Sequence, residues 1–124
     1  MLLNKLFTID TIEVSPSMDR VTVQILLNKD HPLFKGHFPG NPILPGVCTV
    51  QIIKELLEES LHKVLILTKA NTIKYHGFIN PDVTPRIQFD LKFIYTESGR
   101  ISCNANVNSG AAPLCSFKGE FEFI

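Results

Sequence analysis

The sequence predicts an α+β domain in which one long helix packs on an antiparallel sheet, and two observations support this prediction. Residues 46–62 contain neither proline nor glycine after the first position, and their composition favours a helix. Elsewhere apolar and polar residues alternate in four runs, at residues 21–25, 87–93, 101–107 and 115–123, as is typical of half-buried strands. One helix followed by a run of strands predicts the α+β class.

The first expected strand carries the alternating residues Val21, Val23 and Ile25 and ends near Asn28. The next stretch, residues 31–51, holds four of the eight prolines and three of the seven glycines. Pro45 followed by Gly46 suits the entrance of a helix. Because the helix is apolar over a wide arc, we expect the sheet to wrap around it; the arc consists of Ile52, Ile53, Leu56, Leu57 and Leu61.

The strands after the helix differ in regularity. A less regular strand is expected around residues 69–77, and the sequence Asn-Pro-Asp at 80–82 ends it. Three consecutive antiparallel strands follow, joined by turns at ESGR (97–100) and NSGAAP (108–113). The apolar positions of the last two strands are expected in the core, and they include Cys103, Cys115, Phe117, Phe121 and Phe123.

Length and composition argue against several classes of function. The 124 residues suit a single domain, 1–124. Twelve basic residues balance twelve acidic ones, so we expect neither a nucleic-acid partner nor a membrane-surface partner. Three cysteines without a CxxC spacing argue against a disulfide framework and a zinc site, which fits a reducing cytoplasm. The N-terminal MLLNKLF is too short and too interrupted for a signal peptide or a membrane span.

Residues 37–47 read HFPGNPILPGV. This run closely resembles the HFPGxPxxPG signature of the FabA/FabZ group, the 3-hydroxyacyl-acyl carrier protein dehydratases. The resemblance extends over essentially the whole chain and implies the hotdog fold, an antiparallel sheet wrapped around one long central helix. It also implies a homodimer, with two helices inside a joined sheet and acyl-chain tunnels opening at the subunit interface, and it implies no cofactor.

Dehydration of a 3-hydroxyacyl thioester needs a base for the C2 proton, a donor to the thioester oxygen and an acid for the departing hydroxyl. The resemblance assigns the first role to His37, whose imidazole titrates near neutrality. It assigns the second to the backbone amide of Gly46 at the positive end of the helix. Substrate contacts are expected from Gly46, Phe38 and Val47.

The third role departs from the family pattern. Fourteen residues after His37 the dehydratases carry Glu or Asp, whereas this chain has Gln51, whose amide cannot give up a proton at neutral pH. One turn further along the helix stands Glu55. We hypothesise that Gln51 orients the substrate hydroxyl and that Glu55 protonates it, directly or through a water. For Gln51 the alternative to catalysis is a structural or substrate-positioning role. For Glu55 the alternative is an ion pair with a lysine.

Other candidate residues have simpler interpretations. His31 and His37 suggest a metal pair, but no third ligand has a suitable spacing, so no metal is expected. Cys48 could be a nucleophile beside His37, although a cysteine in a first helical turn is more often a packing residue. Glu58 and Glu59 are expected on a solvated helix face.

Three functions remain open at this stage. The first is dehydration of 3-hydroxyacyl-ACP or acyl-CoA thioesters in fatty acid or related lipid and polyene biosynthesis. The second is a hotdog acyl thioesterase, and the third is a non-catalytic acyl-binding subunit that pairs with an active paralogue, because hotdog domains serve all three. The expected assembly is a homodimer, a higher assembly or such a hetero-oligomer. An acidic carrier protein would need basic residues near the site, and the candidates are Lys69, Lys74, Arg86 and Lys92.

Overall fold

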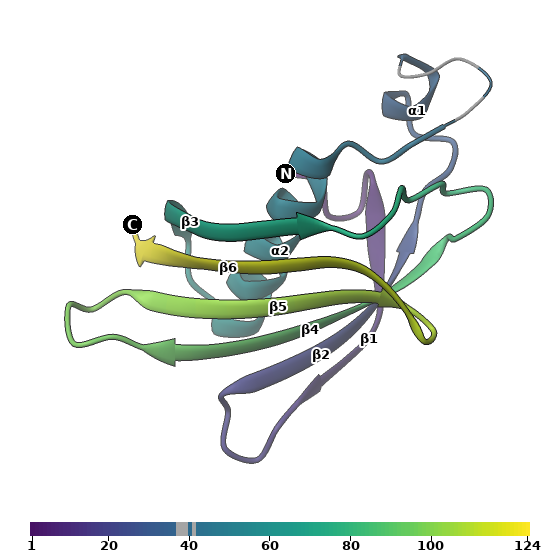
Figure 1. The fold of residues 1–124 in the computed structure, drawn as a ribbon. Helices are drawn as coiled ribbons and strands as arrows, with labels where there is room; N and C mark the ends of the chain where they lie inside the picture. Colours follow the sequence, from purple (N-terminus) through teal and green to yellow (C-terminus); the bar gives the residue numbers. More distant parts are fainter. Residues whose placement is uncertain (37–39, 41) are drawn as a thin grey trace.

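A computed structural model describes residues 1–36, 40 and 42–124, and it confirms the predicted α+β class. Six antiparallel strands form one sheet in the order β1-β2-β4-β5-β6-β3, and α2 lies against one face of it (Figure 1). The elements are β1 (Phe7–Val14), β2 (Arg20–Leu27), α1 (Leu33–Gly36), α2 (Gly46–Leu61), β3 (Leu65–Tyr75), β4 (Arg86–Tyr95), β5 (Ile101–Ser109) and β6 (Ala112–Phe123).

The core lies between α2 and the sheet, as the helix pattern predicts. Four helix residues, Ile52, Ile53, Leu56 and Leu57, are fully buried, and Leu61 packs at the margin of the core. Alternate positions of three strands face them: Val21, Val23, Ile25, Ile87, Phe89, Leu91, Ile101, Cys103, Ala105 and Val107. Since full burial of a Val, Leu, Ile or Phe side chain contributes roughly 1.5–3 kcal/mol, this layer is what holds α2 in place.

The strand β1 has no counterpart among the sequence predictions. It pairs with β2, but the register shifts between Ile9 and Thr11, so its apolar residues do not keep a period of two. Ile12 and Val14, beyond the shift, are exposed. A bulge in an edge strand therefore hides the alternation that would have predicted it.

The strand β3 is longer than expected, because it begins at Leu65 instead of about residue 69 and ends at Tyr75. Its pairing with β6 shifts twice, between Leu67 and Lys69 and between Ala70 and Thr72, which explains its irregular pattern. It forms one edge of the sheet, and every residue from 68 to 75 is exposed.

Most of the expected core of the last two strands is confirmed. Cys103, Cys115, Phe117 and Phe121 are buried. Phe123 was expected there too, but it is 37% exposed, because it sits near the end of its strand and stacks on Tyr95 with ring centroids 6.1 Å apart.

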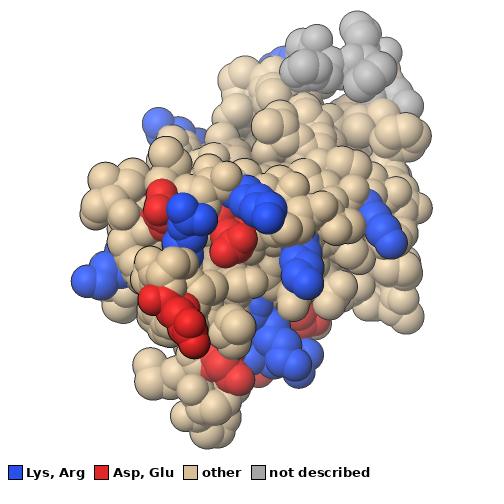
Figure 2. All heavy atoms as spheres, turned by 60° about the vertical axis from the view of Figure 1, so that its left-hand side comes forward, with Lys and Arg blue, Asp and Glu red and all other residues tan. Residues whose placement is uncertain are grey.

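The charges on the surface are mixed. On the face drawn in Figure 2, acidic and basic side chains are interspersed, in keeping with equal numbers of the two in the sequence. In the part of the chain that the structure describes, no helix is both long enough and apolar enough to cross a membrane.

Candidate active site

An apolar pocket of about 530 Å³ opens at the N-terminal end of α2. Its walls are residues 43–46, which lead up to and begin α2, residues 75–79, which run from the last residue of β3 onward, and Thr49 from the first helical turns. Backbone hydrogen bonds fix the second wall: the Leu44 N–H donates to the Ile79 oxygen at 2.8 Å, and the His76 N–H donates to the Leu114 oxygen at 2.9 Å. The volume and the apolar lining suit a small-molecule ligand such as an acyl chain.

The helix entrance supplies the polar end of this pocket. Pro45 occupies the N-cap position with an extended backbone (φ −60°, ψ 141°), as the Pro-Gly pair predicted. A proline side chain has no hydrogen-bond acceptor, so it cannot cap the free N–H groups of the first turn. These groups and the helix dipole favour a negatively charged or strongly polarised oxygen at this end.

Gly46 is in close contact with Tyr75. A Cβ atom at position 46 would lie 2.6 Å from both Cζ and Oη of Tyr75, nearer than real Cβ contacts allow. Only glycine therefore permits the phenol to rest against the helix entrance in this way. Tyr75 is the last residue of β3 and 51% exposed, and burial, followed by the effect of Cys115, raises its pKa, so the phenol stays protonated at neutral pH.

The other titratable residue of the pocket wall is engaged elsewhere. His76 Nε2 lies 3.2 Å from Ser116 Oγ. Ser116 belongs to a second, polar pocket formed by β3, β5 and β6, which His76 also lines. The His76 imidazole is thereby hydrogen-bonded to a serine that lies outside the apolar pocket.

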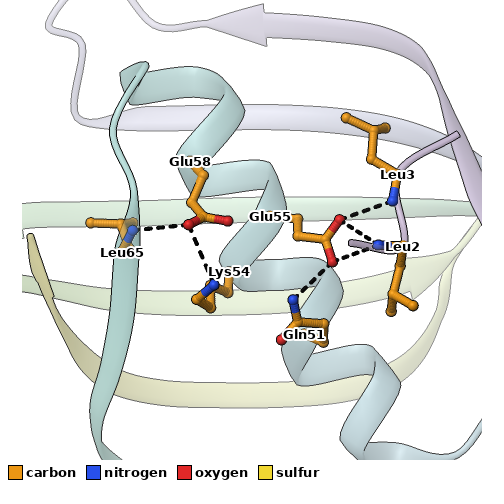
Figure 3. A network of polar contacts seen from close by, with 7 residues as sticks. All are labelled: Leu2, Leu3, Gln51, Lys54, Glu55, Glu58 and Leu65. Atoms are coloured by element: carbon orange, nitrogen blue, oxygen red, sulfur yellow. Dashed lines mark hydrogen bonds and ion pairs between the residues drawn. The ribbon is translucent and has the colours of Figure 1, made fainter. Parts of the chain in front are cut away.

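Gln51 and Glu55 form a separate network with the N-terminal segment (Figure 3). The Glu55 carboxylate accepts hydrogen bonds at 2.9 Å from the backbone N–H groups of Leu2 and Leu3. It also accepts one at 2.8 Å from Gln51 Nε2. Glu55 is only 3% exposed, so these donors replace the water that a buried carboxylate needs. An ion pair with a lysine was one alternative from the sequence; among the described residues the partners of Glu55 are instead two backbone amides and a side-chain amide.

The structure places the predicted site residues in different surroundings. Gly46 lines the apolar pocket, whereas Val47 is 75% exposed and lies outside its wall. His37 and Phe38 lie outside the described residues. Gln51 and Glu55 are absent from the described lining of the pocket: Gln51 donates to Glu55, and Glu55 in turn accepts hydrogen bonds from the N-terminal segment.

Glu58 differs from its expected solvated state. Its side chain is 16% exposed, and its Oε2 accepts hydrogen bonds from Lys54 Nζ at 3.3 Å and from the Leu65 N–H at 2.9 Å. Figure 3 shows how it links α2 to the start of β3. Glu59 is exposed, as predicted.

The contacts of Cys48 and His31 indicate structural rather than catalytic roles. Cys48 is half-buried against the core, and burial raises the pKa of its thiol, which disfavours the reactive thiolate. His31 Nδ1 accepts a hydrogen bond from the Leu33 N–H at 3.0 Å, at the start of α1. Over residues 1–36, 40 and 42–124, no group of three potential metal ligands comes together.

The predicted basic residues do not gather at one place. Arg86 Nη1 is paired with Asp10 Oδ2 at 3.1 Å. Lys74 lines the polar pocket of the outer sheet together with Lys118, and Lys69 and Lys92 are exposed on β3 and β4.

Sequence reasoning missed Tyr75 as a site residue. The expected strand at residues 69–77 includes it, but a tyrosine at a strand end carries no signal of its own. Its importance comes from the contact with Gly46. Gly46 is 29 positions earlier in the sequence, so the contact is visible only in three dimensions.

Comparisons with known proteins identify the family of this chain. The model of the ApeI-like family, described as ApeI dehydratase, matches residues 13–111. The 3-hydroxyacyl-[acyl-carrier-protein] dehydratase FabZ of Acetivibrio thermocellus is 29% identical over 109 residues, which cover 82% of this chain and 73% of that protein. FabZ of Lactobacillus helveticus is 26% identical over 120 residues, with 90% and 77% covered.

Solved structures show the same fold. The dehydratase heterocomplex ApeI:P from Xenorhabdus doucetiae matches with a TM-score of 0.66 at 18% identity, covering 91% of this chain and 95% of that one. The fluoroacetyl-CoA thioesterase FlK matches with a TM-score of 0.66 at 14% identity, covering 93% and 90%. At these identities the structures establish the hotdog fold alone, while the family model spans most of the chain. This chain belongs to the ApeI-like dehydratase family and has the hotdog fold.

Proposed function

We propose that this protein dehydrates 3-hydroxyacyl thioesters to trans-2-enoyl thioesters, carried by acyl carrier protein or coenzyme A, in fatty acid or related lipid and polyene biosynthesis. The observation that carries the proposal is the apolar pocket at the entrance of α2, lined by the Gly46 of the HFPGNPILPG motif. An acyl chain would occupy the pocket, and the thioester oxygen would lie near the positive end of the helix.

The proposed roles follow the chemistry of the reaction. His37 takes the C2 proton, and the Gly46 N–H donates to the thioester oxygen as negative charge develops on it. Phe38 keeps the substrate contact expected from the sequence, and Val47, which does not line the pocket, would contact only the part of the substrate that lies outside it. Removing one donor of this kind costs roughly 10² to 10³ in rate in other enzymes, and we expect a contribution of that order from the Gly46 amide.

The contacts of Glu55 affect which residue can protonate the departing hydroxyl. The hypothesis from the sequence was that Glu55 protonates the departing hydroxyl while Gln51 orients it. Both carboxylate oxygens instead accept hydrogen bonds from amide groups, which occupy the atoms that would carry the proton and turn them away from a substrate. We therefore favour Glu55 as an anchor that fixes the amide of Gln51, which leaves Gln51 to orient a substrate hydroxyl.

We propose a homodimer joined through β3. The strand β3 lies at one edge of the sheet, and its residues 68–75 are exposed. The backbone N–H and C=O groups along such an edge can form hydrogen bonds with another strand. Pairing of two β3 strands would join the two sheets. It would also bring the pocket walls at residues 75–79 close to the subunit interface.

A second candidate function is favoured by one residue. By the resemblance to the FabA/FabZ signature, Gln51 occupies the position of the family's acid, and an amide there is what a non-catalytic acyl-binding subunit would carry. Such a subunit would act in a hetero-oligomer with an active paralogue. The related structure described as a dehydratase heterocomplex is a precedent for assemblies of this kind.

The test is ultraviolet-monitored interconversion of 3-hydroxyacyl and trans-2-enoyl thioesters with a thiol reagent in the same cuvette. We expect turnover in the wild type and a loss of about 10² or more in His37→Ala. His62→Asn is the matched control, because His62 is exposed at the end of α2 with a positive φ of 55° that asparagine tolerates. Thiol release would indicate a thioesterase, and a silent wild type that gains turnover in Gln51→Glu would indicate the non-catalytic subunit.

A further inference from the structure

We infer that the Tyr75 phenol is the catalytic acid of this site, in place of the acid that position 51 lacks. The inference rests on the proposed dehydratase function and assigns the one role that the motif residues leave open. Two side chains among the described residues of the pocket wall are of types that serve as general acids in enzymes, those of Tyr75 and His76. His76 is tied to Ser116 outside the pocket, which leaves Tyr75.

The position of the phenol suits this role. The packing against Gly46, where an added Cβ would meet Oη and Cζ at 2.6 Å, puts the hydroxyl at the helix entrance, where the thioester is expected to bind. The C3 hydroxyl of a 3-hydroxyacyl thioester is three bonds from the thioester carbon, within reach of a group beside that entrance. Tyr75 is half exposed and therefore open to a substrate, unlike Glu55, which is 3% exposed and fully occupied by amide donors.

The chemical step balances without any further reactant. The base takes the C2 proton, and the electron pair of that C–H bond forms the C2–C3 double bond. The C3–O bond breaks, and the departing oxygen keeps its electron pair and takes the phenolic proton, so that water leaves. The phenolate regains a proton from solvent while the base loses one, which restores both groups. Burial favours the neutral phenol, so the acid is in its proton-bearing form at the start of the cycle.

Tyr75→Phe tests the inference, because it removes the hydroxyl and keeps the ring against Gly46. Steady-state kinetics with a short and a medium-chain 3-hydroxyacyl thioester should show kcat lowered by about 10² to 10⁴ with KM nearly unchanged. Tyr95→Phe is the matched control: Tyr95 is the other tyrosine, it stacks on Phe123, and its loss of a hydroxyl should leave both constants unchanged. Circular dichroism and a thermal unfolding midpoint confirm that each variant folds.

The outcomes separate this inference from the proposed function. A kcat that falls tenfold or more in Tyr75→Phe, but not in Tyr95→Phe, supports it. A smaller loss, or a change confined to KM, overturns it and leaves Tyr75 as a wall of the pocket. If the wild type itself does not turn over, the proposed function and this inference both fail, whereas an active wild type with an active Tyr75→Phe rejects only the inference.

Discussion

Replacing Glu55 by alanine should destabilise the fold strongly, although glutamate is rarely a core residue. The substitution leaves the backbone N–H groups of Leu2 and Leu3 and the amide of Gln51 without their acceptor. A hydrogen bond to a charged group contributes about 1.5–3 kcal/mol net. The lower value for each of the two backbone donors gives a loss of about 3 kcal/mol, and Gln51 adds little because its side-chain amide can turn to bind water, whereas the two N–H groups are fixed in the backbone.

Urea unfolding followed by circular dichroism measures this loss. Glu59→Ala is the matched control on the same helix, and it should change the free energy of unfolding by less than about 0.5 kcal/mol because Glu59 is exposed. Glu55→Gln should cost only about 1 kcal/mol, since its remaining oxygen still accepts from the backbone and the Gln51 amide can flip to face the new amide. A Glu55→Ala variant as stable as Glu59→Ala would refute the view that this carboxylate anchors the N-terminal segment.

Three further predictions concern packing and charge. Gly119→Ala should cost about 1–3 kcal/mol of stability in urea unfolding, because its Cβ would lie 2.6 Å from the backbone oxygen of Lys69 and β3 would have to shift; an unchanged midpoint would contradict this contact. Burial raises the pKa of Cys103 to about 12 from an ordinary value of 9.0, so the folded state binds a proton that the unfolded chain loses above about pH 9. The free energy of unfolding of the wild type should therefore fall between about pH 9 and 12. The fall should be steeper than in Cys103→Ala by up to about 1.4 kcal/mol per pH unit. Parallel pH profiles of the two proteins would contradict this effect of Cys103. Arg86→Ala should leave stability within about 0.5 kcal/mol, because its pair with Asp10 is solvent-exposed, and a larger loss in urea unfolding would show that the pair is more than a surface contact.

The fold was predictable wherever a regular period survives. The helix at 46–61 and the strands around Val23, Phe89 and Cys103 follow the expected patterns, because each buries one uninterrupted face. The strand β1 was missed and β3 was misplaced at its start, and both are edge strands with register shifts. A bulge moves the apolar residues to the other phase, so a period of two cannot reveal such strands.

The site was predictable only in part. The loop motif identifies the family and points to Gly46, because its prolines and glycines lie close together in the sequence. The environment of Glu55 depends on Leu2 and Leu3, more than fifty residues away, and the contact of Tyr75 with Gly46 spans the whole of α2 and β3. Contacts of this range leave no spacing that a single sequence can show. His37 lies outside the described residues, so its role as the base stays a prediction.

The central claim is that this chain adds and removes water at a thioester without cleaving it, and mass spectrometry tests this claim most directly. A trans-2-enoyl thioester is incubated with the wild-type protein in ¹⁸O-labelled water, and the masses of the intact products are measured. The account predicts a 3-hydroxyacyl thioester that has gained one labelled water and keeps its thiol carrier. A labelled free acid with released thiol, or unchanged enoyl thioester after prolonged incubation, would contradict it.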